Sequence, residues 1–270
     1  MGLTEALETP ATSSLIMLTC CITLWLWHKR ISVESVAFSY RSVVLKHEVW
    51  RVLTAGMSHF DVLHLLFNLS SLWGMRGHEK RLGSSLYLSQ SLLILLCSKL
   101  CQTILYSTLI RRGFRNFVDQ KSVGYSGVLF GWMTVGAALP GAGSLNLPGN
   151  LTLAPEAVPF FNLALAQLLM RRSSFFGHLG GIAAGLAAAW GLLDFLQRPY
   201  WAWLFLMWFL VIIGGSLKAT TSFPVPFITY IDPHFGESSL SNIRCRAFDW
   251  NSPGGFDDYV DGYSSQSRAV

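Results

Sequence analysis

Charged residues are scarce in this chain: they make up 13% of its 270 residues, whereas an ordinary soluble domain has about a quarter. Hydrophobic residues reach 51% and gather in long runs. This balance excludes an ordinary soluble domain and indicates a protein that crosses the lipid bilayer several times. The net charge of +5 comes from basic residues scattered between the apolar runs. Because they form no Lys/Arg block and no patch interleaved with aromatics, we expect no nucleic-acid partner.

Cysteine is also sparse, and its spacing excludes two kinds of site. The five cysteines form neither a CxxC pair nor the Cys/His spacing that zinc requires, so we expect no disulfide framework and no metal site. Four of them lie in apolar runs, where a thiol behaves as a small hydrophobic group: Cys20, Cys21, Cys97 and Cys101. The N-terminus lacks a basic region and a small-residue cleavage site, which predicts that its first apolar run is retained.

Seven apolar runs approach the length of a membrane helix, which needs about 20 residues. They lie near 13–28, 60–76, 84–110, 124–140, 155–171, 176–196 and 200–217. The sixth run is rich in Gly and Ala, which predicts a central helix, because small residues let helices approach closely in lipid. The seventh is rich in Trp and Phe, which is typical of a peripheral, lipid-facing helix.

The runs also divide the chain into parts. We expect a short N-terminal tail (1–12), a core of six helices (13–197), a further transmembrane helix (198–217) and a polar C-terminal tail (218–270). The tail is rich in Pro, Ser, Gly and Asp, a composition that predicts disorder. Between the first two runs, segment 29–59 mixes apolar and basic residues, which predicts a structure lying in the membrane interface.

A serine and a histidine stand where two of these helices would begin. Gly124-Tyr125-Ser126-Gly127 opens the fourth run and His178 opens the sixth. The two glycines leave room near Ser126 for a substrate carbonyl and for backbone N–H donors. Taken alone, this pattern is more typical of close helix packing. A histidine at membrane depth is a functional hypothesis by default, and serine needs such a base to act as a nucleophile.

The residues after His178 predict how the two helices meet. In His178-x-x-Gly181-x-x-x-Gly185 the three residues share one helix face, which can lie against the Ser126 helix. Phe130, one turn after Ser126, can pack on the imidazole ring, although ordinary packing is nearly as good an interpretation.

Two further polar residues lie on one face of the second run. His64 and Asn68 are four residues apart, and both can donate the hydrogen bonds that an oxyanion requires. Glu79 follows that run and could form a structural ion pair with Arg51 or Arg76, a choice that the sequence leaves open.

Together these motifs resemble the rhomboid family of intramembrane serine proteases. The matching pieces, in the family's order, are Trp50-Arg51, His64-x-x-x-Asn68, Glu79 through Gly83, Gly124-x-Ser126-Gly127 and His178-x-x-Gly181-x-x-x-Gly185. The resemblance covers about 13–196. It implies an all-α polytopic membrane protein with a six-helix core, to which this chain adds a seventh, C-terminal transmembrane helix.

The resemblance also implies an activity. It implies a serine endopeptidase that cleaves single-pass membrane proteins within or near their transmembrane helix, in the lipid bilayer and without metal or organic cofactor. Ser126 would be the nucleophile and His178 the general base. His64, Asn68 and the Ser126 backbone N–H would form the oxyanion hole. Segment 29–59 would be the family's first loop, and the run at 155–171, with Phe160 and Phe161, would be the lateral gate for the substrate helix.

Two other functions compete with proteolysis. A catalytically inactive rhomboid-like protein would bind or retain membrane proteins, but such relatives usually lose the serine or the histidine, and both are here. A transporter or channel would need polar residues along several runs, whereas here they gather near one depth.

The side on which the active site opens is indicated in two conflicting ways. The basic loops place it on the cytosolic side, whereas the family resemblance places it on the lumenal or extracellular side, which we favour. The sequon Asn150-Leu151-Thr152 lies on the opposite side, so its glycosylation would reverse this orientation. We expect a membrane of the secretory pathway.

Overall fold

The structure is a computed structural model that describes residues 3–148, 151–170, 173–197 and 199–222. The predicted polar tail lies almost wholly outside the described residues, as does Asn150 of the sequon. The described part is mostly α-helical, with short 3-10 and π turns, connecting loops and one antiparallel hairpin, β1 (Leu145–Leu147) and β2 (Leu151–Leu153). The helices are α1 (Leu3–Glu8), α2 (Pro10–His28), α3 (Val33–Val36), α4 (Arg51–Met57), α5 (Val62–Gly74), α6 (Gly77–Leu82), α7 (Ser84–Arg111), α8 (Ser126–Ala137), α9 (Val158–Leu169), α10 (Phe175–Ala189) and α11 (Pro199–Thr220).

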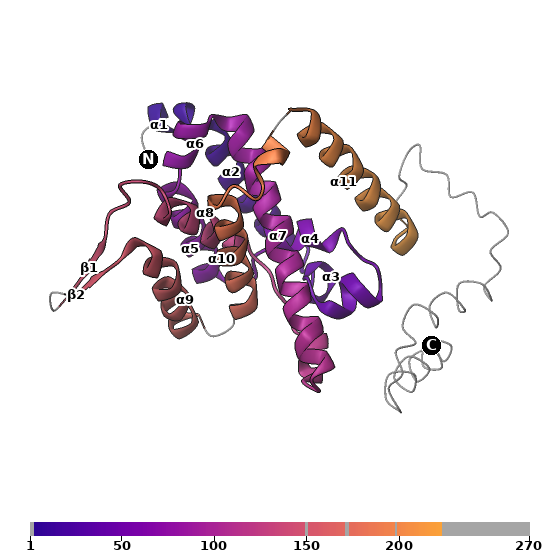
Figure 1. The fold of residues 1–270 in the computed structure, drawn as a ribbon. Coiled ribbons are helices and arrows are strands. Elements are labelled where there is room, and N and C mark those ends of the chain that lie inside the picture. Colours follow the sequence, from indigo (N-terminus) through magenta and orange to yellow (C-terminus); the bar gives the residue numbers. More distant parts are fainter. Residues whose placement is uncertain (1–2, 149–150, 171–172, 198, 223–270) are drawn as a thin grey trace, which may run out of the picture. The chain divides into compact units, whose positions relative to one another are not determined.

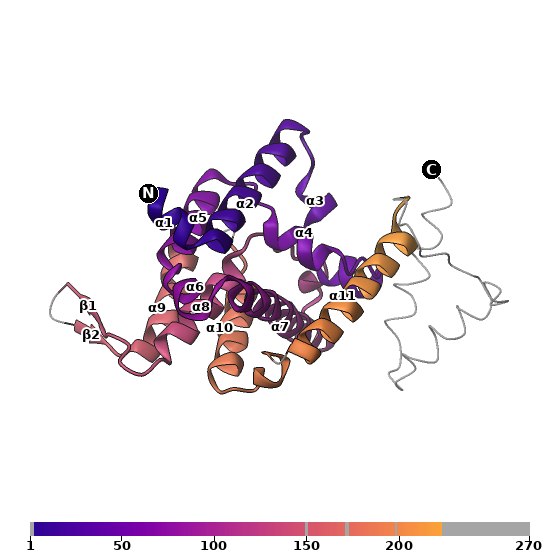
Figure 2. The ribbon, with the colours of Figure 1, turned by 90° about the horizontal axis from the view of Figure 1, so that it is seen from above.

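Three helices, α7, α8 and α10, form the centre of the fold in both ribbon views (Figure 1 and Figure 2). The prediction that the Gly/Ala-rich sixth run is central is confirmed, since α10 packs against both α7 and α8. Its buried face consists of small residues with one aliphatic side chain and the histidine: Gly177, His178, Gly180, Gly181, Ile182, Ala184 and Gly185. The other helices pack around these three, with α2 and α5 on one side and α9 on another.

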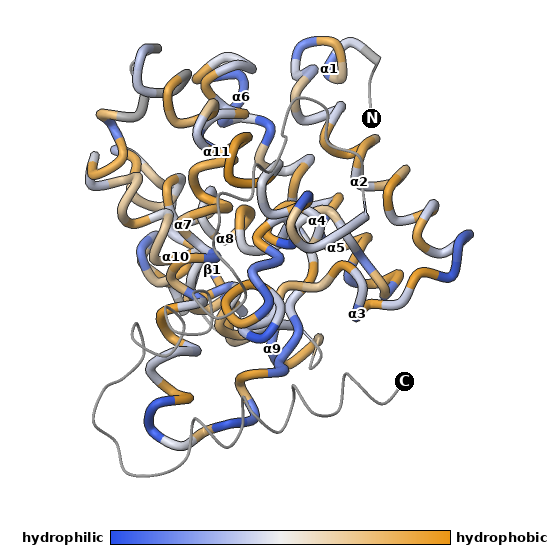
Figure 3. The backbone as a smooth tube through the Cα atoms, turned by 90° about the vertical axis from the view of Figure 1, so that its right-hand side faces the viewer, coloured by the Kyte–Doolittle hydropathy of each residue, from blue (hydrophilic) through white to orange (hydrophobic). Residues whose placement is uncertain are grey.

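Within the described residues, two helices are long and apolar enough by composition to cross a membrane, α2 and α7. Three further apolar stretches are shorter: α8, α10 and the part of α11 from Leu204 to Thr220. Hydrophobic residues follow these helices, and hydrophilic ones gather at connections such as the one after α2 (Figure 3). The sixth run was predicted to reach residue 196, but α10 ends at Ala189 because Gly191, with φ of 73°, reverses the backbone there.

The segment between α2 and α5 folds into a compact loop, which we call the first loop (residues 29–59). It contains α3, a π-helical turn (Arg41–Leu45) and α4. Arg51 holds it together, because its guanidinium donates to the Glu48 carboxylate and to the Glu34 carbonyl and lies over the Trp50 ring, 4.9 Å from the centroid.

The last helix, α11, is docked on this loop by polar contacts. Ser216 Oγ donates to the His47 carbonyl at 2.7 Å and accepts the Val49 N–H at 2.9 Å, and Trp50 Nε1 donates to Thr220 Oγ1 at 3.1 Å. On its outer face α11 exposes large apolar side chains, which confirms the predicted peripheral position: Met207, Trp208, Leu210, Val211 and Ile212.

Glu79 caps a helix and forms neither ion pair considered from the sequence. Its carboxylate accepts the N–H groups of Ala11 at 2.8 Å and Thr12 at 2.7 Å, at the start of α2, and the Ser84 hydroxyl at 2.6 Å. The free N–H groups of a helix N-terminus attract an anion, which explains this pairing. Arg51 and Arg76 bind Glu48 and Glu5 instead.

Candidate active site

Ser126 and His178 are brought together by the packing of α8 against α10. Ser126 is the first residue of α8, and its Oγ lies 2.8 Å from His178 Nε2, a hydrogen-bond distance. His178 lies in the first turn of α10 with 1% of its surface exposed. The Phe130 ring stacks on the imidazole with centroids 4.5 Å apart and an interplanar angle of 23°, so the packing predicted for Phe130 is confirmed.

Glycines make this approach of the helices possible. A β-carbon on Gly185 would lie 2.4 Å from the Gly131 carbonyl oxygen, and one on Gly181 would lie 2.1 Å from the Gly127 carbonyl oxygen. Real β-carbons do not come so close to an oxygen, so larger residues would push the helices apart. The prediction that the face carrying Gly181 and Gly185 lies against the Ser126 helix is confirmed.

His64 lies beside the serine through its contact with Gly124. Gly124 has φ of 104°, and a β-carbon there would lie 2.6 Å from His64 Cε1. Glycine is therefore required at 124 both by the backbone conformation and by the imidazole ring. His64 is 9% exposed, and among the described residues its Nε2 has no hydrogen-bond partner, which leaves it available to a ligand.

Asn68 lies one turn further along α5 and is only partly available. Its Nδ2 donates to the His64 carbonyl at 2.8 Å, so one of its two N–H groups is used within the helix. Asn68 is 4% exposed. The structure therefore places His64 against the residue two before Ser126, with Asn68 one turn along the same helix.

The dyad has no acidic third member in the described part of the chain. His178 Nδ1 has no hydrogen-bond partner there, and no described carboxylate pairs with the imidazole. For Nε2 to accept a proton from Ser126, Nδ1 must carry the ring's other proton. Stacking on Phe130 then holds the ring plane, a task that a carboxylate performs in the three-residue form of such sites.

The strand-like segment before Ser126 is attached to the first loop. Phe38 and Ser122 exchange two backbone hydrogen bonds, of 3.1 and 2.9 Å, in an antiparallel bridge. Nearby, the Arg41 guanidinium binds the Asp119 carboxylate through two nitrogens and holds the pKa of that carboxyl below its usual value. Lys121 also binds Glu34. The first loop therefore fixes the backbone that leads into the serine.

Several polar residues near the dyad were missed from the sequence. His59 is fully buried, with its ring 5.0 Å from that of His64. Lys99 and Gln102 lie in the middle of α7 and are also buried. A charged residue inside an apolar run was the available signal for Lys99, because such residues in membrane segments need partners.

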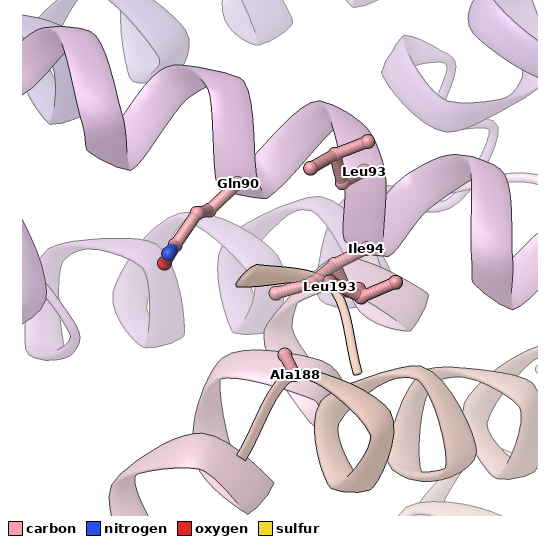
Figure 4. Close-up of a pocket in the computed structure, with 5 residues that line it drawn as sticks. All are labelled: Gln90, Leu93, Ile94, Ala188 and Leu193. Carbon is pink, nitrogen blue, oxygen red and sulfur yellow. The ribbon is translucent and has the colours of Figure 1, made fainter. Parts of the chain in front are cut away.

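A small pocket lies elsewhere, between α7 and the end of α10 (Figure 4). It is lined by Gln90, Leu93, Ile94, Ala188 and Leu193. Ala188 follows His178 by ten residues on one helix, or about 15 Å along its axis. None of these side chains is titratable, so the pocket is unsuited to acid–base chemistry.

Known proteins are similar to this chain in sequence. A family model of the rhomboid domain matches residues 46–195. Rhomboid-like protein 15 of Arabidopsis thaliana is 29% identical over 60% of this chain and 41% of its own length. Rhomboid-like protein 14, mitochondrial, of the same plant is 28% identical over 53% of the chain and 44% of its own length. Rhomboid protease GlpG of an Enterobacter species is 28% identical over 65% of the chain and 61% of its own length. The chain thus spans between 41% and 61% of the length of these relatives.

Proposed function

The chain belongs to the rhomboid family, and is thus a membrane protein, and from this premise we propose that it is an intramembrane serine endopeptidase. Its substrates are single-pass membrane proteins, cut within or near their transmembrane helix. One observation carries the proposal: Ser126 Oγ, half-buried, lies 2.8 Å from Nε2 of the buried His178. A serine and a base at this distance form the minimal unit of nucleophilic catalysis.

The reaction uses the dyad in two steps. His178 Nε2 accepts the Ser126 proton while Oγ attacks the scissile carbonyl, and the imidazolium then returns the proton to the leaving amine. This releases one fragment and leaves an acyl-enzyme. A water molecule, deprotonated by the same nitrogen, hydrolyses the ester and restores the serine.

The developing oxyanion needs donors that are already in place. We assign this task to His64 Nε2, to the Asn68 N–H that the helix does not use, and to the Ser126 backbone N–H. The last of these belongs to the first turn of α8, where N–H groups have no partner within the helix and the helix dipole favours negative charge.

The substrate helix would enter beside α9. This helix is joined to the core mainly by a small cluster of Phe130, Leu163 and Ile182, and it exposes Phe160, Leu165, Leu168 and Leu169. Such a helix can move at low cost, because few buried contacts hold it. In this proposal α2, α5, α7, α8, α9 and α10 are the six membrane helices of the core, and α11 is the seventh.

The direct test is cleavage of a reporter. A single-pass protein whose transmembrane helix is weakened by Gly and Ala is co-expressed with wild-type protein and with the Ser126→Ala and His178→Ala variants. A fluorophosphonate probe measures serine reactivity in parallel. Wild type should cut the reporter and label, and both variants should do neither. Ser89→Ala is the matched control, since within the described structure Ser89 Oγ donates only to the Leu86 carbonyl of its own helix.

The same assay separates the alternative. A catalytically inactive rhomboid-like protein would bind the reporter equally well as wild type and as Ser126→Ala, with neither cleavage nor labelling. That result would replace the protease assignment by a binding function.

We also propose a membrane of the secretory pathway, with the active site on the lumenal side. The test combines Arg112→Asn with Phe114→Thr, which builds a sequon in the loop at the Ser126 end of the fold. This variant should gain an endoglycosidase-sensitive mass, whereas native Asn150 should stay unmodified. Modification at Asn150 alone would place the active site on the cytosolic side.

A further inference from the structure

A lysine is buried in the centre of the fold, where an apolar residue would be expected. Lys99 lies in the middle of α7 with 5% of its surface exposed. Its Nζ donates to Gln102 Oε1 at 3.1 Å and to Ser122 Oγ at 3.0 Å, and it lies 4.8 Å from the centroid of the Phe38 ring. Among the described residues no carboxylate pairs with it.

Stability gives no reason for an ammonium at this position. Removing a charge from water is costly, and an apolar residue of similar volume usually serves a protein core as well or better. Neutral oxygens and an aromatic ring offset this cost only in part. Compared with an apolar side chain of similar length, such as methionine, lysine adds a set of N–H donors. The hydrogen bonds that these donors make therefore indicate the role of Lys99.

One donor reaches the segment that carries the serine. Ser122 lies four residues before Ser126, and its backbone is bridged to Phe38 of the first loop. Lys99 therefore contacts both sides of this bridge, through the Ser122 hydroxyl and through the Phe38 ring.

The other donor leads to the helix that carries the histidine. Gln102 Nε2 donates to Ser174 Oγ at 3.2 Å. That oxygen also accepts the N–H of Gly177, the residue before His178, at 3.1 Å. Ser174 thus caps the N-terminus of α10. The chain of contacts from Ser122 through Lys99 and Gln102 to Ser174 thus connects the two backbone segments that hold the dyad.

We propose that Lys99 is a positioning residue that sets the distance between Ser126 Oγ and His178 Nε2 through Ser122 and Ser174. The inference rests on the proposed function, because that distance matters only if the dyad reacts. Near-attack geometry is sensitive to small shifts, and a displacement of about 1 Å can cost about 100-fold in rate. Loss of the donors should therefore lower turnover much more than substrate binding.

The test uses purified full-length protein with Lys99→Met, which keeps the volume and removes the donors. Probe labelling of Ser126 and kcat for the reporter should fall about 10-fold or more, while KM stays within about twofold. Lys99→Gln, which restores two N–H donors without the charge, should recover at least a third of the lost rate. Leu100→Met is the matched control, because Leu100 is 60% exposed on the same helix.

A double variant tests whether Lys99 acts on the reaction rate through Ser122. If Lys99 acts through Ser122, Lys99→Met combined with Ser122→Ala should be no slower than Lys99→Met alone. Strictly multiplicative losses would overturn that route. Wild-type labelling rates in Lys99→Met would overturn the proposal. If Lys99→Met does not fold, Ser122→Ala alone must show the fall in kcat without a change in KM, and wild-type kcat in it would overturn the proposal.

Hydrogen exchange separates this proposal from the proposed function. In Lys99→Met the amides of 119–125 and 174–178 should exchange faster than in wild type, whereas those of α2 should not change. A wild-type protein that neither cleaves nor labels would refute the protease assignment alone. Unchanged exchange in both segments would refute the positioning role even in an active enzyme.

Discussion

Gly181 touches the backbone of Gly127: a β-carbon on Gly181 would lie 2.1 Å from the Gly127 carbonyl oxygen. One of these residues follows Ser126 and the other lies one turn beyond His178. This close contact between α8 and α10 therefore also holds the side chains of Ser126 and His178 at hydrogen-bond distance.

Gly181→Ala should separate α8 from α10 and inactivate the site. The added methyl group meets backbone atoms, which cannot rotate away, so we expect a loss of about 1–3 kcal/mol in the free energy of unfolding. Probe labelling of Ser126 should fall about 10-fold or more. Thermal unfolding in detergent and labelling rates check both values. Gly215→Ala is the control, since a β-carbon there would meet no atom within 4 Å in the described part of the chain, its own helix backbone aside; equal effects in the two variants would contradict the packing argument.

Phe130→Leu should slow the reaction while leaving the fold intact. The variant keeps an apolar side chain in the cluster with Leu163 and Ile182 but loses the stack on the imidazole. Aromatic pairs contribute about 0.5–1.5 kcal/mol beyond their burial, which corresponds to a fall of about 2- to 12-fold in kcat. Phe130→Tyr, which keeps the ring, should stay close to wild type in the reporter assay. A Leu variant as fast as the Tyr variant would show that ring orientation does not depend on Phe130.

Ser216→Ala should loosen the first loop from α11. Ser216 is 8% exposed, and its hydroxyl donates one hydrogen bond to the His47 carbonyl and accepts one from the Val49 N–H, so the substitution removes two polar contacts between α11 and the loop. We expect a loss of about 1–3 kcal/mol in the free energy of unfolding. Limited proteolysis should then cut within residues 41–50 sooner than in wild type. Ile212→Ala, an exposed position on the same helix, is the control; loop cleavage at the same rate in both variants would argue against the anchor.

Glu79→Gln should remove a pH-dependent part of the stability. Burial raises the pKa of the Glu79 carboxyl, but hydrogen bonds from Ser84, Thr12 and Ala11 outweigh it and hold the pKa below its usual value of 4.5. Because the folded pKa is the lower one, the ionised group stabilises the fold at neutral pH. That contribution is lost as the pH falls below about 4.5 and through the folded pKa.

The measurement is the unfolding temperature of the two proteins across pH. Glu79→Gln should unfold at a lower temperature than wild type at pH 7, and the gap should narrow as the pH falls below about 4.5. Glu156→Gln, on the 3-10 turn Pro155–Ala157 before α9, is the matched control. A gap that stays constant over this range would show that the charge of Glu79 does not cap α2.

The proximity of Ser126 and His178 could be predicted from the sequence because it follows from helical periodicity. Gly181 and Gly185 lie on the same helix face as His178, and Gly124 and Gly127 flank Ser126. The contact between α8 and α10 could therefore be predicted from a local sequence pattern. The Phe130 stack follows from the same one-turn spacing. Patterns of this kind need no knowledge of how distant segments pair.

The polar network could not be read in this way. Lys99 bonds Ser122 and, through Gln102, reaches Ser174, which is 75 residues later in the chain, and no local period relates these positions. For Glu79 the sequence offered only charged side chains as partners, whereas the carboxylate binds backbone N–H groups of α2. Nearly every residue has a backbone N–H group, so the residue types at a helix end do not reveal these donors. A search for partners among charged side chains therefore misses them.

In the proposed protease, the shortness of α8 would determine what becomes of a cleaved substrate. Its 12 residues span about 18 Å, whereas the hydrocarbon core of a bilayer is about 30 Å thick. With the far end of an upright α8 level with one surface, Ser126 would stand about 12 Å below the other. A membrane helix severed at that depth leaves one fragment with about eight apolar residues in lipid, well under the 20 or so that hold a helix across it. The proposed hydrolysis would thereby turn an anchored protein into one that can diffuse away into water.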